Sequence, residues 1–282
     1  MIPQVVLISL CLATATAASN PKTAKGELRL AFFLKSMTPL QYTLWKEFGR
    51  QMLFSTGIFA ALFIILYIAE SVNPVLSGTL LQWHEPSFLV GIPASVIGVA
   101  YVLTIRNPKN YTGFVGGIIM SLLLAVQFYL LGNIDLVILQ LCVFIPFLLS
   151  SLLRWRRISL ADKDDSSFTP QWLPIKQQVA SLALMMVILV ADYTLATEVI
   201  QHNAWCDNIT LKLMGGLMIA SSTLANFILI YQKIDAWIWW VIYACSGMIF
   251  YALIGNTFSF VLFTVFLLVN GGTGIAWIKL RK

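Results

Sequence analysis

The chain has 282 residues, of which 59% are hydrophobic and only 11% are charged, and its formal net charge is +6. A water-soluble protein of this length needs far more charge to cover its surface, so the composition excludes that class and indicates a polytopic membrane protein. The positive charge gives no indication of nucleic-acid binding, because the basic residues lie in the connections between long apolar blocks.

Residues 1–51 are predicted to form an N-terminal segment. Its opening stretch, residues 1–20, is an apolar run that ends in small residues, as a signal peptide does. No basic residue precedes this run, whereas several follow it before the next apolar block. A cleaved signal, a short interfacial segment and a ninth membrane segment therefore all stay open.

Eight later blocks are apolar and long enough to cross a membrane, since a spanning helix needs about 20 mostly apolar residues. None of them alternates with the period of two that is typical of a membrane barrel. Backbone in lipid must satisfy its own polar groups, so each block is predicted to be a helix of an all-α protein. The blocks are residues 52–72, 87–105, 111–131, 134–154, 179–200, 208–231, 236–253 and 257–277.

The Lys and Arg residues fall in every second connection between these blocks, with Lys212 as the exception. Because cytoplasmic loops carry the excess of basic residues, eight helices with both termini in the cytoplasm account for this distribution. The same rule makes residues 158–178 a cytoplasmic loop. We therefore predict a multi-pass protein of the inner (plasma) membrane.

The two ends of the apolar region contain a weak internal repeat. Ala94-Ser95 matches Ala220-Ser221, and Tyr111 and Phe114 fall on Trp237 and Trp240 at an offset of 126 residues. The repeat predicts two three-helix units that point the same way, residues 87–157 and 208–282, joined by a linking helix at 179–200. Parallel repeats with a central site are a recurrent plan of membrane transporters.

Four stretches make the sequence resemble the PnuC-type vitamin transporters: SVIGVAYVLTIRNPKNYTGFVGGI, LVILQLCVF, NFILIYQKIDAWIWWVI and FTVFLLVNGGTGIAWIK. The resemblance covers residues 90–280. It implies a SWEET-like 3+1+3 core of seven helices, with residues 52–72 as an extra membrane helix. It further implies facilitated diffusion of a vitamin precursor, above all nicotinamide riboside, by alternating access. A cytoplasmic vitamin kinase of NAD biosynthesis would trap the substrate by phosphorylation, and the transporter would be a homotrimer.

The chain also departs from the pattern of that family. Ala244, Phe263 and Gly272 stand where family members often carry polar residues on the inner faces of the last two helices. The substrate therefore stays open among nicotinamide riboside, thiamine, riboflavin and other nucleoside-like solutes.

The next-to-last helix is predicted to present an aromatic face to the substrate. Trp237, Trp240 and Tyr251 share one helical face with Ala244. Flat or cationic rings bind well over such side chains, with about 0.5–2 kcal/mol for a cation over Trp. The alternative is that the tryptophans are interfacial anchors, as Trp239 is expected to be.

Three amides deep in the predicted helices, Gln140, Asn226 and Asn270, are further candidate substrate ligands. Polar side chains inside the membrane are costly unless they are paired or face a cavity. Each could bond a ribose or an amide of the substrate, or could instead bond another helix at about 0.6 kcal/mol on average.

Acids, histidines and cysteines are dispersed along the chain, and no nucleophile motif, phosphate loop or metal-ligand spacing occurs. We therefore predict no catalytic residues, no metal site and no cofactor. An enzyme is disfavoured, and a structural subunit of a membrane assembly is the remaining alternative to a transporter.

Overall fold

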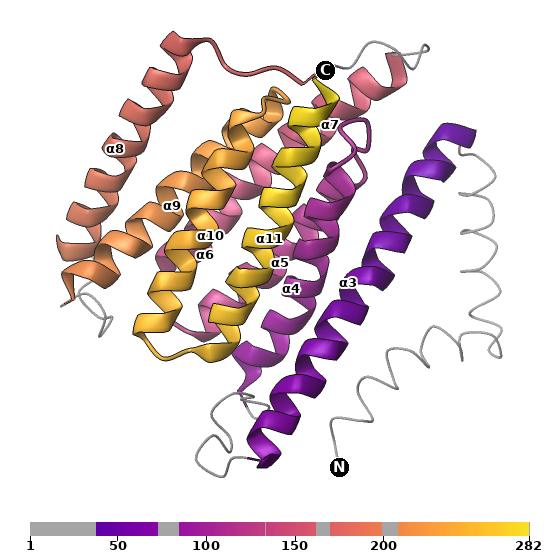
Figure 1. The fold of residues 1–282 in the computed structure, drawn as a ribbon. Coiled ribbons are helices and arrows are strands. Elements are labelled where there is room, and N and C mark those ends of the chain that lie inside the picture. Colours follow the sequence, from indigo (N-terminus) through magenta and orange to yellow (C-terminus); the bar gives the residue numbers. More distant parts are fainter. Residues whose placement is uncertain (1–37, 73–84, 133, 162–169, 199–207, 282) are drawn as a thin grey trace. The chain divides into compact units, whose positions relative to one another are not determined.

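The computed structural model describes residues 38–72, 85–132, 134–161, 170–198 and 208–281 (Figure 1). The chain divides into two compact units between Glu47 and Phe48. The question of a signal peptide concerns residues 1–20, which lie outside the described residues, as does the middle of the predicted cytoplasmic loop.

The described residues are almost wholly helical, which confirms an all-α polytopic membrane protein. Eight helical stretches among them are long and apolar enough to cross a membrane, as the hydropathy pattern predicts. One of these spans is divided into α6, a π-helical turn η3, and α7. The elements are α3 (Pro39–Val72), α4 (Pro86–Ile105), α5 (Gly113–Leu130), α6 (Ile134–Ile138), η3 (Leu139–Phe144), α7 (Ile145–Ala161), α8 (Ile175–Glu198), α9 (Ile209–Ile230), α10 (Asp235–Leu253) and α11 (Thr257–Leu280).

Helix α3 begins at Pro39, well before the expected residue 52. The backbone N–H of Thr38 donates to Gln41 Oε1 (3.0 Å), and the N–H of Gln41 donates to Thr38 Oγ1 (3.3 Å). This reciprocal pair is a capping box, and proline is favoured at the first helical position that follows it. Hydropathy missed this first part because Lys46 makes it polar, although a charged side chain does not interrupt a helix.

Six spans close a ring around a common interior. Each packs against the next in the order α4, α5, α7, α9, α10 and α11, and α11 packs back against α4. Helix α8 packs on α9 and takes no place in this ring. Because both neighbours of every ring helix are other ring helices, the interior is bounded by elements far apart in the sequence.

The π-helical turn follows from a proline in the same span. Pro146 has no N–H to donate to a carbonyl four residues earlier, which interrupts the α-helical ladder at this point. Just before it, the N–H of Ile145 donates to the carbonyl of Gln140, five residues back. Single π turns of this kind occur frequently at functional sites.

Residues 170–174 are tied to the turn between α9 and α10. The N–H of Leu173 donates to Asp235 Oδ2 (2.7 Å), and the N–H of Ile234 donates to the carbonyl of Gln171 (3.1 Å). These bonds fix the start of α8 beside the start of α10. Both positions adjoin connections that carry basic residues.

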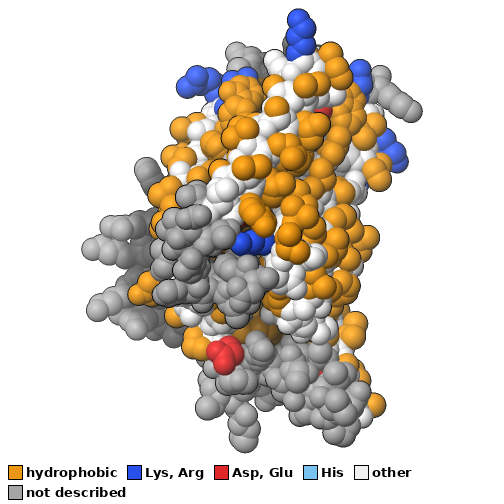
Figure 2. Space-filling view, turned by 90° about the vertical axis from the view of Figure 1, so that its left-hand side faces the viewer, with side chains coloured by type: hydrophobic (Ala, Val, Ile, Leu, Met, Phe, Trp, Pro, Cys, Tyr) orange, Lys and Arg blue, Asp and Glu red, His pale blue; other side chains and the backbone are white. Residues whose placement is uncertain are grey.

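The outer surface is apolar, as lipid contact requires. Figure 2 shows one face covered largely by hydrophobic side chains, with most of its Lys and Arg side chains at the upper end. Lys212, the exception to the charge pattern, is buried, and its Nζ lies 4.8 Å from the ring centroid of Tyr193 on α8.

Candidate functional site

The six-helix ring encloses a cavity of about 210 Å³. One ordered water needs about 10–15 Å³ by the same measure, so the cavity has room for a small organic molecule. Each of the six ring spans contributes lining residues, whereas α3 and α8 contribute none. The lining includes Phe88, Gly91, Ser95, Gly98, Tyr101, Met120, Gln127, Gln140, Ser222, Trp240, Tyr243, Tyr251, Phe258, Phe263, Phe266 and Asn270.

Small residues on one face of α4 create part of this space. A Cβ at Gly91 would lie 2.6 Å from Gln127 Nε2, and a Cβ at Gly98 would lie 2.7 Å from Met120 Sδ. The absent side chains thus leave room for Gln127 and Met120 of α5, which both line the cavity.

Helices α10 and α11 supply an aromatic wall. The rings of Trp240 and Tyr243 lie 5.4 Å apart, Phe263 lies 5.2 Å from both Tyr243 and Tyr251, and Phe266 follows at 6.0 Å from Phe263. These separations are typical of favourable aromatic pairs. The wall is therefore a continuous cluster of rings along one side of the cavity.

Within the part of the chain that the structure describes, three polar atoms at the cavity are buried without a hydrogen-bond partner: Tyr101 OH, Gln140 Oε1 and Asn270 Oδ1. Leaving such an atom unsatisfied costs about 1–3 kcal/mol. They come from α4, η3 and α11, so three separate elements present unused polar atoms around one space. A molecule in the cavity with several donors would recover these interactions.

Among the described residues, every side chain that lines the cavity is uncharged. A charged group without a partner is very costly to transfer from water to such surroundings. An anion therefore finds no counter-charge here, whereas a delocalised cation can be stabilised by aromatic faces.

The structure brings together four of the six residues that the sequence suggested as substrate ligands. Trp240, Gln140, Tyr251 and Asn270 line the cavity. Gln140 belongs to η3, Trp240 and Tyr251 to α10, and Asn270 to α11.

The other two, Trp237 and Asn226, do not line the cavity. Trp237 is buried against Trp277, with ring centroids 5.3 Å apart, and Asn226 Nδ2 donates to the carbonyl of Ser222 in its own helix. Trp239 is also buried, which does not agree with its expected place as an interfacial anchor. A helical face drawn from the sequence does not reveal which part of it a neighbouring helix covers.

Sequence reasoning missed Tyr101 and Tyr243 as lining residues. The signal for Tyr101 was present, because Gly91, Ala94 and Gly98 form a stripe of small residues on the same face of α4. Phe263, noted as a departure from the family pattern, also lines the cavity.

The two ends of the cavity are built differently. At the tryptophan end, defined by Phe114, Trp155, Trp237 and Trp277, Phe114 contacts Trp155 (4.7 Å between centroids) and Trp155 contacts Trp277 (5.8 Å). Trp155 Nε1 donates to the carbonyl of Leu229, and Trp277 Nε1 donates to that of Arg106, both at 3.1 Å.

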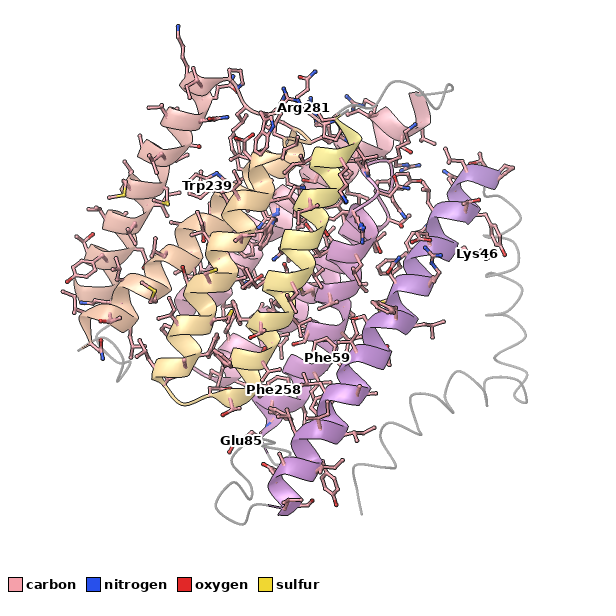
Figure 3. The ribbon with its side chains drawn as sticks, in the orientation of Figure 1. Lys46, Phe59, Glu85, Trp239, Phe258 and Arg281 are labelled. Atoms are coloured by element: carbon pink, nitrogen blue, oxygen red, sulfur yellow. The ribbon has the colours of Figure 1, made fainter. Side chains whose placement is uncertain are left out.

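At the phenylalanine end, defined by Phe63, Phe88 and Phe258, the rings of Phe88 and Phe258 meet edge to face at 4.8 Å. Both belong to the cavity lining, near the starts of α4 and α11. In Figure 3, Phe258 and Glu85 mark this end, and Arg281 marks the opposite one.

Comparison with known proteins agrees with this architecture. The model of a family described as "Nicotinamide mononucleotide transporter" matches residues 89–279, which is more than half of the chain. A solved structure described as "Crystal structure of the Vitamin B3 transporter PnuC" superposes with a TM-score of 0.56 at 15% identity, covering 83% of this chain and 97% of that chain. The likeness shows a shared fold. No curated protein matches the sequence.

Proposed function

Since the chain belongs to the nicotinamide mononucleotide transporter family, we propose that it carries a small aromatic vitamin or vitamin precursor, with nicotinamide riboside as the favoured substrate. The observation that carries this proposal is the cavity itself: uncharged, walled by aromatic rings and edged by three unpartnered polar atoms. Alternative substrates of the same kind are thiamine, riboflavin and other nucleoside-like solutes.

The uncharged lining favours the riboside over the mononucleotide. A phosphate would have to lie in the cavity with no Lys or Arg among the lining residues, at a high desolvation cost. The riboside instead combines a flat cationic ring, suited to Trp240 and Tyr243, with hydroxyl donors. Those hydroxyls match the acceptor oxygens of Gln140 and Asn270, which have no partner.

A SWEET-like 3+1+3 arrangement is supported by reciprocal contacts between the two predicted three-helix units. Trp155, near the end of the first unit, bonds the last turn of α9, and Trp277, near the end of the second, bonds Arg106 after α4. Each unit thus attaches its third helix to the end of the other unit's first helix. Helix α8 would be the linking helix, and α3 the extra one.

The middle helices of the two units also end alike. Gly132 after α5 has φ of 75°, and Gly255 after α10 has φ of 73°. Their separation, 123 residues, is also that of Phe114 and Trp237, which contact Trp155 and Trp277 respectively. This favours aligning Phe114 with Trp237, in place of the offset of 126 residues that the sequence suggested.

Facilitated diffusion by alternating access is supported by the same features. Among the described lining residues there is no Asp, Glu, His, Lys or Arg side chain that could carry a coupling proton. Phosphorylation by a cytoplasmic vitamin kinase would then give a product too strongly charged to re-enter the cavity, which makes uptake effectively one-way. The distribution of Lys and Arg supports both termini in the cytoplasm of an inner-membrane protein, and the family resemblance implies a homotrimer.

The substrate is tested by uptake into proteoliposomes. Labelled nicotinamide riboside is expected to equilibrate across the membrane without an ion gradient. Unlabelled thiamine, riboflavin and nicotinamide mononucleotide serve as competitors, and the mononucleotide is expected to compete weakly. Uptake of thiamine or riboflavin alone would reassign the substrate, and no uptake of any of them would favour a structural subunit.

The binding site is tested with two amide substitutions. Gln140→Leu removes an unpartnered acceptor at the cavity, and the loss of one hydrogen bond should raise KM about 2- to 10-fold. Asn226→Leu is the matched control, because Asn226 is buried in the ring and does not line the cavity. It should leave KM unchanged, and equal KM values for both variants would contradict the proposed site.

A further inference from the structure

Helix α3 is outside the six-helix ring and contributes nothing to the cavity lining, so the proposed transport function gives it no role. From Phe48 onward many of its large apolar side chains are exposed, among them Leu53, Phe54 and Ile64. Its buried side chains instead form one stripe, Ser55, Phe59 and Leu66, at the spacing of a single helical face. The helix therefore has one specific contact face.

That contact face meets the ring at the phenylalanine end of the cavity. The ring of Phe63 stacks on that of Phe258, with centroids 5.7 Å apart and planes 19° apart, and lies 6.3 Å from Phe88. Leu66, Phe88 and Phe258 are buried together, with Leu62 packed against them. A lipid-facing helix thus touches both residues whose rings bridge α4 and α11.

A polar contact fixes the height of α3 along the ring. Ser55 Oγ donates to the carbonyl of Val96 on α4 at 2.6 Å, and the Phe59 side chain beside it is buried. Figure 3 labels Phe59 on α3 and Phe258 on α11. The bond holds Phe63 at the level of the Phe88–Phe258 pair.

We propose that α3 is a brace for the phenylalanine end of the cavity. Phe63, stacked on Phe258, holds the Phe88–Phe258 pair in contact and so opposes the separation of α4 and α11. Phe63 is a positioning residue that never touches the substrate. Opening of this end requires the edge contact to break, and α3 sets how often that happens.

The test measures access to the cavity without using a substrate, so its outcome is independent of the proposed function. Ser95 lines the cavity two turns beyond Phe88, and Ser95→Cys places a thiol there in a background whose native cysteines are replaced by Ser. The protein, in lipid nanodiscs, is labelled with a membrane-impermeant maleimide. The rate constant of labelling reports how often the cavity is open.

Phe63→Ala should raise this rate constant about 2- to 10-fold, the range expected for the loss of one or two aromatic contacts. Phe54→Ala is the matched control, because Phe54 lies on the same helix and is 58% exposed. It should leave the rate unchanged. Phe63→Leu keeps an apolar side chain without a ring, and it replaces the Ala variant if that one fails to fold.

Unchanged labelling in both Phe63 variants, or an equal rise in the Phe54 control, would overturn the brace. Uptake measured on the same variants separates the two proposals. If the Phe63 variants are labelled faster but the protein transports none of the vitamins, the proposed brace is supported and the proposed transport of those vitamins is rejected.

Discussion

The two ends of the cavity close in different ways. The tryptophan end joins the two predicted three-helix units through two directional indole bonds and a row of buried rings. The phenylalanine end is a contact between rings, Phe88 against Phe258, supported by Phe63 from a helix outside the ring. Ring contacts can separate without leaving a buried donor unpaired, whereas the indole bonds cannot. We therefore expect the phenylalanine end to open at a lower free energy.

The largest effect is expected from truncating the tryptophan end. Trp277 is fully buried, and Trp277→Ala should lower the free energy of unfolding by about 3–5 kcal/mol, because a large cavity replaces the indole. Thermal unfolding in detergent measures the loss. Leu268→Ala is the control, since Leu268 lies on the same helix and is 71% exposed. A loss at Trp277 no larger than at Leu268 would contradict the assigned packing.

Removing rings at the phenylalanine end should cost less stability and affect access more. Phe258→Leu loses its contacts with Phe88 and Phe63, so we expect a loss of about 1–3 kcal/mol. Labelling of a thiol at position 95 should also accelerate. If Trp277→Ala increased the labelling rate more than Phe258→Leu did, the tryptophan end would be the end that opens more easily.

The indole bonds can be removed while an aromatic ring is kept at each position. Trp277→Phe should cost about 2–3 kcal/mol, of which about 1 kcal/mol is the hydrogen bond and the rest is the space that the smaller ring leaves. Trp155→Phe should cost about 0.5 kcal/mol less than Trp277→Phe, because the carbonyl of Leu229 also accepts the N–H of Gln232. Denaturant unfolding of the two variants measures the difference. Equal losses of unfolding free energy in the two variants would show that the bond from Gln232 does not compensate the Leu229 carbonyl for the lost indole donor.

The smallest effect is expected for the polar contact of the brace. Ser55→Ala removes the bond to the carbonyl of Val96 and should cost about 0.6 kcal/mol, the average for such bonds between membrane helices. Thr56→Ala is the control, because the hydroxyl of Thr56 donates to Met52 in its own helix. A greater loss for Thr56→Ala would argue against the contact between α3 and α4.

Much of the helical architecture could be predicted from hydropathy, because lipid demands long apolar helices. Residue 257 is both the expected and the observed start of α11, and residue 253 is both the expected and the observed end of α10. The start of α3 was missed, since it depends on a cap formed by Thr38 and Gln41 and not on hydropathy.

Less of the cavity could be predicted, because its lining depends on which faces the neighbouring helices cover. Gln140 and Asn270 stood out as polar residues in apolar helices, and both line the cavity. Trp237 and Trp240 looked alike in sequence, yet only Trp240 lines the cavity, because Trp277 covers Trp237. The burial of Trp237 depends on a contact with a residue 40 positions away in the sequence. The periodicity of a single helix cannot reveal such a contact.

The π-helical turn at Leu139–Phe144 has a consequence for variation in chain length. A hydrogen bond that spans five residues accommodates one residue more than an α-helical bond does. A chain that is one residue shorter in this turn can keep α6 and α7 in register, with Trp155 on its present face. It would lose only the local widening that carries Gln140. Deletion of a single residue at this point is therefore a route to new substrate preferences that leaves the packing of the ring intact.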